Sequence, residues 1–266
     1  QNKTNLSGKI KLVFQPAEEG VRGAAAIAAS GIIDDADYFA ASHISFCADT
    51  GTVIVNPKNF LSTTKIDIRY KGKPAHAGAA PHSGRNALLA AAHAVTQLHG
   101  IARHGEGMTR INVGVLNAGE GRNVIPASAE IQLEVRGENK VINQYMVDQV
   151  MQIAQGIALS FDVSYETEIM GEAVDMNNDV ELVQLLEEIA LQQPQIQHTN
   201  AAYAFNASED ATILGRRVQE HGGKAIYFII GADRTAGHHE AEFDFDEQQL
   251  LTGANIYITL IQRLMA

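Results

Sequence analysis

Two adjacent carboxylates, Glu18 and Glu19, are the first residues of the chain whose types and spacing could do chemistry. They follow an apolar run, residues 8–14, which predicts a buried strand that ends before Pro16. Ligand sites in open α/β sheets lie beyond the carboxyl ends of strands. At such a place one carboxylate can bind a divalent metal while its neighbour acts as a general base. The alternative is a solvated helix start, where acidic residues favour the helix dipole.

Three histidines occupy comparable positions in the sequence. His43 follows a predicted strand at residues 38–42, and His238 and His239 lie in a glycine-flanked loop after a predicted core strand, residues 225–230. Mixed imidazole and carboxylate ligands suit Zn or Mn. Each histidine alone could be structural. Because all these side chains are expected at the ends of neighbouring parallel strands, together they favour a metal site.

A second group of candidate residues lies in the middle of the chain. His76 belongs to a loop rich in glycine, alanine and proline, and Asn123 lies in the segment 121–126. Arg136 ends a predicted strand, where its guanidinium could form a bidentate pair with a carboxylate. For Arg136 the alternative is an ordinary surface ion pair.

The elements that must position this second group follow the order β-α-β-β-α-β. This order is typical of the split-βαβ or ferredoxin-like arrangement, in which helices cover one face of an antiparallel sheet. The alternation of apolar and polar residues supports half-exposed strands. The predicted strands are residues 63–70, 109–117, 123–136 and 161–169, and the predicted helices are residues 86–99 and 141–159.

The flanking parts of the chain predict an α/β fold whose parallel strands are covered on both faces. Their predicted helices lie within residues 17–30 and at residues 178–192, 209–221 and 246–265. We therefore expect one α/β domain in two pieces, residues 1–61 and 173–266. An inserted α+β domain, residues 62–172, separates the two pieces.

Composition and charge exclude several classes of protein. With 45% hydrophobic and 19% charged residues, the 266-residue chain is typical of a globular protein. The net charge of −11 and the absence of tryptophan disfavour a nucleic-acid binder. No apolar run is long enough to predict a membrane span. The single cysteine, Cys47, favours a reducing cytoplasm.

Taken together, the motifs resemble the M20 metallopeptidase/amidohydrolase family, in order and over nearly the whole chain. The resemblance rests on residues 15–20, His43 and residues 74–86, 121–126 and 243–247. Residues 208–212 and 237–239 resemble one branch of the family, the hydrolases of p-aminobenzoyl-glutamate. The resemblance implies a two-part α/β catalytic domain with a ferredoxin-like lid and dimerisation domain.

The resemblance also implies a role for each candidate residue. Glu18 corresponds to the general base, and Glu19, His43 and either His238 or His239 to metal ligands. Two divalent metals, Zn or Mn, are expected in a complete active site. The residues expected to hold the substrate carboxylate and polarise the scissile carbonyl are His76, Asn123 and Arg136.

The expected activity is hydrolysis of an N-acyl amino acid, most specifically of p-aminobenzoyl-glutamate to p-aminobenzoate and glutamate. The expected partners are a second hydrolase subunit and a second copy of the chain, bound through the lid so that His76 reaches the neighbouring site. The upstream family motif of the Cys-Gly-His-Asp type is missing, so we expect an incomplete catalytic domain that is inactive alone. The alternatives are another N-acyl-amino-acid hydrolase, such as a hippurate-like one, and a non-catalytic fragment that binds or dimerises.

Overall fold

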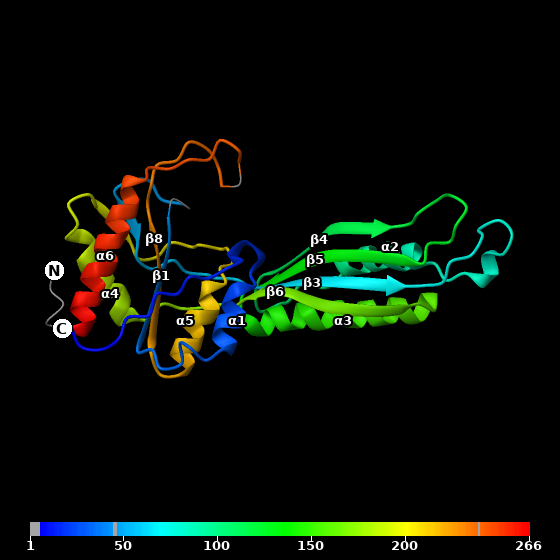
Figure 1. The fold of residues 1–266 in the computed structure, drawn as a ribbon, viewed down its shortest axis with the longest axis horizontal. Helices are drawn as coiled ribbons and strands as arrows, with labels where there is room; N and C mark the ends of the chain where they lie inside the picture. Colours follow the sequence, from blue (N-terminus) through cyan, green and yellow to red (C-terminus); the bar gives the residue numbers. More distant parts are fainter. Residues whose placement is uncertain (1–5, 45–46, 239) are drawn as a thin grey trace.

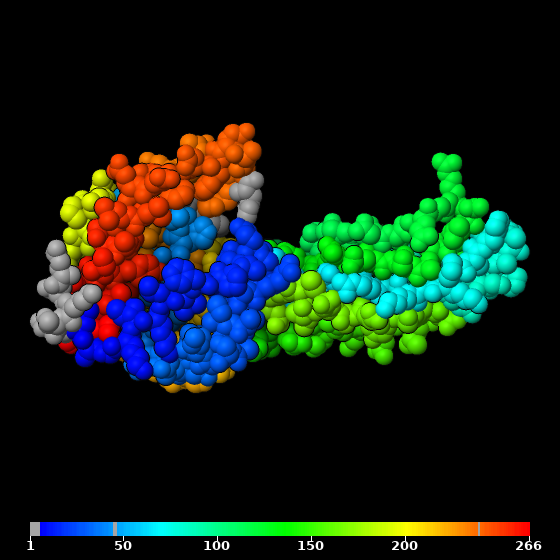
Figure 2. Space-filling view, viewed as in Figure 1, coloured from blue at the N-terminus to red at the C-terminus, as the bar shows by residue number. Residues whose placement is uncertain are grey.

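The computed structural model describes residues 6–44, 47–238 and 240–266, and it forms an elongated molecule with a sheet in each half (Figures 1 and 2). The first sheet has the strand order β1-β8-β2-β7. Its strands are β1 (Tyr38–Ile44), β8 (Lys224–Ile230), β2 (Thr52–Ile54) and β7 (His198–Asn200). Strands β1 and β8 are parallel, β2 is antiparallel to β8, and β7 is parallel to β2.

Helices cover both faces of this first sheet (Figure 1). These helices are α1 (Gly23–Ala29), α4 (Val180–Leu191), α5 (Ala211–Glu220) and α6 (Gln248–Met265). Alternate side chains of β8 pack on opposite faces of the sheet. Phe228 packs with residues of α4 and α6, and Tyr227 packs in the hydrophobic core on the other face. Burial on both faces explains why β8 is a continuous apolar run.

The second sheet is antiparallel throughout, with the order β4-β5-β3-β6. Its strands are β3 (Ser62–Lys71), β4 (Thr109–Ala118), β5 (Ser128–Gly137) and β6 (Ser164–Ala173). Two helices, α2 (Ala87–His99) and α3 (Lys140–Phe161), pack on one face. The other face is polar; there Arg69 is bonded to Glu130 and Glu168. This sheet order and connectivity are those of the ferredoxin-like arrangement.

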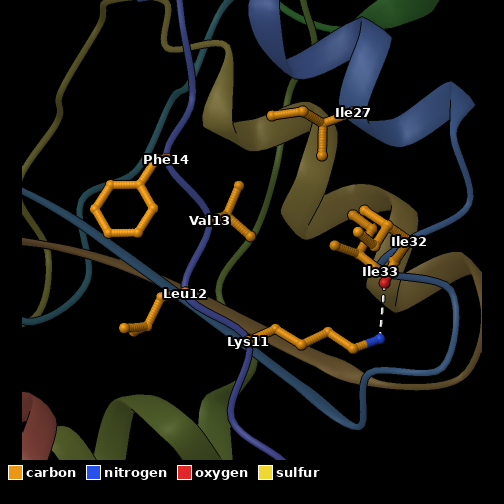
Figure 3. Close-up of a pocket in the computed structure, with 7 residues that line it drawn as sticks. All are labelled: Lys11, Leu12, Val13, Phe14, Ile27, Ile32 and Ile33. Atoms are coloured by element: carbon orange, nitrogen blue, oxygen red, sulfur yellow. Dashed lines mark hydrogen bonds between the residues drawn. The ribbon is translucent and has the colours of Figure 1, made fainter.

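The predicted α/β fold class with a ferredoxin-like insertion is confirmed, but the strand predicted at residues 8–14 is wrong. That segment is extended and pairs with no strand in the described part of the chain. The Leu12 and Phe14 side chains are 76% and 88% exposed, and Figure 3 shows this segment facing Ile27 and Ile32 across a pocket. Apolar composition forms a strand only where a neighbouring strand supplies the backbone hydrogen bonds.

Several predicted boundaries also differ from the structure. The strand predicted at residues 123–136 begins at Ser128, because Pro126 lacks a donor and residues 121–125 form a loop. The strand predicted at residues 161–169 is displaced to β6, since helix α3 continues to Phe161. No helix in the described ranges is long and apolar enough to cross a membrane.

Candidate active site

Glu18 and Glu19 lie in a tight turn, the 3-10 helix η1 (Glu18–Gly20), rather than after a strand. Non-glycine residues in the left-handed region flank the turn, Ala17 with φ 57° and Val21 with φ 50°. For a β-branched residue such as Val21 this conformation is a genuine outlier, of a kind that concentrates at functional sites. A hydrogen bond of 2.7 Å from the Val21 N–H to the Glu18 carbonyl closes the turn.

The Glu18 carboxylate belongs to a group of three acidic side chains. Its ligand oxygen and those of Glu209 and Asp210 all lie within 4.8 Å of one another. Burial around the Glu18 carboxyl, followed by the negative charges of Glu209, Asp210 and Glu19, raises its pKa from 4.5 to about 7. A carboxyl with this pKa can both accept and release a proton near neutral pH.

Glu209 and Asp210 were not among the predicted site residues, although they lie in the segment 208–212. They are only 6% and 0% exposed, in front of helix α5. Glu209 accepts a hydrogen bond of 2.8 Å from the Tyr227 hydroxyl. Acidic residues before a helix usually indicate a solvated cap, so only their burial distinguishes this pair.

The two described histidines of the predicted metal site lie together. His43 is in strand β1, whose parallel neighbour β8 leads into the loop that carries His238, and the two ring centroids are 5.5 Å apart. The His43 Nδ1 lies 2.7 Å from the Ile44 carbonyl oxygen, which can only accept a hydrogen bond. Nδ1 is therefore the donor in this contact, an arrangement that orients the ring in many metal-binding histidines. His239 lies outside the described residues.

Glu19 and Arg136 lie toward the junction between the two sheets. The Glu19 carbonyl accepts a hydrogen bond of 3.0 Å from Lys65 Nζ of strand β3. Arg136 pairs with Thr63 across β5 and β3, at the end of β3 that adjoins the first sheet. Its guanidinium is partly buried and bonded to the Glu134 carboxylate at 2.9 Å, so the carboxylate partner in this structure comes from the same strand.

His76 and Asn123 lie together at the opposite end of the second sheet. The Ala77 N–H donates a 2.8 Å hydrogen bond to the Asn123 carbonyl, and the loops that carry the two residues form the tip at the far right of Figure 1. The His76 Nδ1 accepts hydrogen bonds from the Gly78 and Ala79 N–H groups. The length of strand β3, about 30 Å for its ten residues, separates this tip from Arg136. One chain thus does not bring the three predicted substrate-binding residues together.

The geometry agrees with what a comparison with known proteins shows. The pattern of Peptidase family M20/M25/M40 matches residues 1–263. The chain belongs to this family. In this M20 chain, the turn with Glu18 and Glu19, the histidine pair and the ferredoxin-like insertion are therefore parts of a hydrolase-family fold.

This M20 chain is similar in sequence to proteins that are named as hydrolases. It is 83% identical over 266 residues to a protein of Haemophilus influenzae named as the homolog of a p-aminobenzoyl-glutamate hydrolase subunit, covering 100% of this chain and 63% of that relative. It is 46% identical over 248 residues to the "Indole-3-acetyl-aspartic acid hydrolase" of Enterobacter agglomerans, covering 93% and 57%. The chain thus spans less than two thirds of the length of these relatives.

A solved structure agrees with the sequence relatives. The aminobenzoyl-glutamate utilization protein from Klebsiella pneumoniae superposes on this M20 chain with a TM-score of 0.86 and 42% identity. The superposition covers 95% of this chain and 61% of that protein.

Proposed function

We propose that this chain forms part of a metal-dependent amidohydrolase that cleaves p-aminobenzoyl-glutamate to p-aminobenzoate and glutamate. The observation that carries the proposal is the Glu18 carboxyl, whose pKa is raised to about 7 in a turn that also presents Glu19. This is the proton affinity that suits a general base near neutral pH. The substrate is inferred from the 83% identical relative, whose name specifies it.

The donor groups of the site suit a divalent cation. The carboxylates of Glu18, Glu209 and Asp210 concentrate negative charge near Glu19, which a cation would relieve. His43 is held through Nδ1 by the Ile44 carbonyl, as metal-binding histidines often are. We infer that Glu19, His43 and His238 or His239 hold a metal, with Zn and Mn as the candidates and two ions in the complete site. When bound, the metal supplies Lewis-acid polarisation of the scissile carbonyl.

The protein's own groups supply proton transfer and substrate binding. Glu18 takes the proton of the attacking water and passes it to the nitrogen of the leaving amine, which completes cleavage of the amide. Arg136 exchanges its present partner, Glu134, for the carboxylate next to the scissile amide. An arginine suits this role because its planar fork matches a carboxylate.

We further propose a homodimer formed through residues 62–172, the lid domain of a catalytic domain made of residues 1–61 and 173–266. The position of His76 and Asn123 at the far tip supports this assembly, because there the length of β3 separates them from Arg136 of the same chain. A different hydrolase subunit is a further proposed partner, since the name of the 83% identical relative describes one subunit of a hydrolase. The single cysteine supports a cytoplasmic location.

A second candidate substrate is another N-acyl amino acid, because a 46% identical relative is named for indole-3-acetyl-aspartic acid. The third candidate is a non-catalytic fragment that only binds or dimerises. The decisive experiment measures release of p-aminobenzoate and of other acyl groups from a panel of N-acyl amino acids. The protein is assayed at its full natural length after loading with Mn²⁺ or Zn²⁺. Preference for another acyl group contradicts the substrate, and absence of all metal-dependent turnover contradicts the enzyme.

A further inference from the structure

Residues 16–23, here called the Glu18 loop, form a closed loop with a narrow neck. A Cβ atom added at Gly23 would lie 1.8 Å from the Pro16 carbonyl oxygen, so the two ends of the loop are in direct contact. The Arg22 N–H also donates a hydrogen bond of 3.3 Å to the Ala17 carbonyl. The strained residues Ala17 and Val21 lie between these contacts. Something outside the loop must hold this conformation in place.

The Asp210 carboxylate binds the chain on both sides of that neck. Its Oδ1 accepts a hydrogen bond from the Gln15 side-chain amide, and its Oδ2 accepts one of 3.3 Å from the Ala24 N–H. Gln15 precedes the Glu18 loop and Ala24 follows it. Since Asp210 is 0% exposed, water does not compete for these bonds.

The position of Asp210 in its own helix makes this arrangement informative. Asp210 is the N-cap residue of α5, where an aspartate ordinarily accepts a hydrogen bond from an amide of the first helical turn. Here its side chain makes no such capping bond. Both carboxylate oxygens instead bond to the residues on either side of the Glu18 loop, Gln15 and Ala24. The neighbouring Glu209 accepts a hydrogen bond from the Ala211 N–H. A role in capping the helix therefore does not explain Asp210.

The second sheet supports the other side of the same loop. The Glu172 N–H of strand β6 donates a hydrogen bond of 2.8 Å to the Val21 carbonyl. A Cβ atom at Gly171 would lie 2.3 Å from the Gly20 carbonyl oxygen, so only glycine allows β6 to approach this closely. The Glu18 loop is therefore held at its tip by β6 and at its neck by Asp210.

We propose that Asp210 is a positioning residue, which clamps the neck of the Glu18 loop so that Glu18 and Glu19 keep their orientation for hydrolysis. The inference rests on the proposed function only for its effect on turnover. That Asp210 holds the loop in place can be tested without measuring any activity. Asp210 also belongs to the group of three carboxylates that could hold a cation, so the test must separate positioning from metal ligation.

The variants separate shape from charge. Asp210→Ala removes the hydrogen bonds to Gln15 and Ala24. Asp210→Asn keeps the side-chain shape, and it can keep both hydrogen bonds if the side-chain amide of Gln15 flips so that its oxygen accepts. Gln15→Ala removes one bond and leaves the Asp210 carboxylate intact, and it still tests the inference if Asp210→Ala does not fold. Asp34→Ala is the matched control, because Asp34 also ties a segment near α1 to α5, through Arg217, without touching the Glu18 loop.

Hydrogen–deuterium exchange of the peptide that spans residues 16–24 is the first measurement. We expect Asp210→Ala to accelerate exchange there by about tenfold or more, Gln15→Ala by less, and Asp34→Ala not at all. The second measurement is Mn²⁺ stoichiometry by calorimetry at the protein's full natural length. We expect Asp210→Asn to keep both the slow exchange and the full Mn²⁺ stoichiometry.

The third measurement is kcat and KM for p-aminobenzoyl-glutamate. We expect Asp210→Ala to lower kcat by about 10²-fold with a smaller change in KM, and Asp210→Asn to recover most of the loss. Unchanged exchange in Asp210→Ala overturns the inference whatever the activity. Loss of Mn²⁺ in Asp210→Asn overturns it in favour of a metal ligand. Faster exchange together with an inactive parent protein supports the clamp and contradicts the proposed function instead.

Discussion

The Tyr227 hydroxyl donates a 2.8 Å hydrogen bond to Oε2 of Glu209, and this buried pair lies directly beside the Glu18 carboxylate. The negative charge of Glu209 is, after burial, the largest cause of the raised pKa of Glu18. Tyr227, on the inner strand β8, therefore holds in place the carboxylate whose charge acts on the proposed base.

Glu209→Gln should therefore shift the pH dependence of the reaction. Removing one negative charge lowers the pKa of Glu18, so Glu18 becomes ionised at lower pH. A general base must be ionised to act. The acidic limb of the kcat/KM profile should therefore move to lower pH, in the same direction as the pKa of Glu18. The measurement is a pH–rate profile of the metal-loaded protein. Glu181→Gln, at the surface beside Lys224, is the control and should leave the limb in place.

Glu18→Gln should keep bound metal and lose turnover by about 10²–10⁴-fold. The amide cannot accept the proton, while the proposed ligand Glu19 is unchanged. The measurement combines metal analysis with initial rates for p-aminobenzoyl-glutamate. Near-normal turnover, or loss of metal, would mean that the roles of Glu18 and Glu19 are exchanged.

The same substitution should stabilise the metal-free protein at alkaline pH. The folded-state pKa of Glu18 is about 7, above its ordinary value of 4.5, so the folded state binds more protons between these two pH values. The free energy of unfolding should therefore fall as pH rises through this window, and the loss should persist above it. Glu18→Gln removes this dependence, which thermal unfolding at pH 5 and pH 8 can measure. An equal change in Tm at both pH values would contradict the assigned shift.

Arg136→Ala should mainly weaken substrates that carry a free carboxylate next to the amide. Loss of a charge-assisted bidentate pair weakens transition-state binding, measured from kcat/KM, by about 2–5 kcal/mol when the partner charge stays buried. An amidated substrate analogue should be nearly indifferent to the change. Arg69→Ala is the matched control, since Arg69 binds carboxylates on the same sheet at Glu130 and Glu168. Equal damage to both substrates would show that Arg136 is structural.

The sequence predicted those elements whose patterns are local. Strand β3 alternates Ile66 and Ile68 toward the helices with Asp67 and Arg69 toward the polar face, and this period of two is visible in the sequence alone. The run at residues 8–14 is just as apolar, but a strand also needs a partner, which the pattern of one segment does not specify. The three-residue strands β2 and β7 are too short to show any period.

The candidate site shows the same division. His43 could be found because it lies at the end of a predicted strand, and Glu18 and Glu19 because they are adjacent carboxylates in a motif, although the strand expected before them does not form. Glu209 and Asp210 lie in the segment 208–212, but their role could not be predicted because it comes from burial against residues about 190 positions earlier in the chain. Similarly, the sequence grouped His76 with Arg136, whereas the length of β3 places them at opposite ends of one sheet.

The last prediction concerns assembly through the second sheet. Strands β4 and β6 each pair on one side only among the described strands, and unpaired edges invite association. Beside the β4 edge, Leu116 and Leu89 of α2 are 44% and 46% exposed. The alanines at 87, 90, 91 and 94 of α2 are buried against the sheet, so the expected contact rests on the exposed leucines. We expect a twofold dimer at micromolar concentration in sedimentation experiments, and Leu89→Asp should dissociate it.

Mixing two inactive variants tests whether His76 acts on the neighbouring site. In a dimer of Glu18→Gln with His76→Ala, one of the two sites combines an intact Glu18 with an intact His76 from the other copy. Random reassociation should therefore restore about a quarter of the parental turnover, whereas each variant alone stays inactive. If His76 instead served its own chain, both copies of a mixed dimer would stay inactive, one without the Glu18 carboxylate and the other without the His76 imidazole. Mixing would then restore no turnover. Recovery on mixing thus identifies action in trans, and a clean monomer in sedimentation contradicts both the dimer and this role of His76.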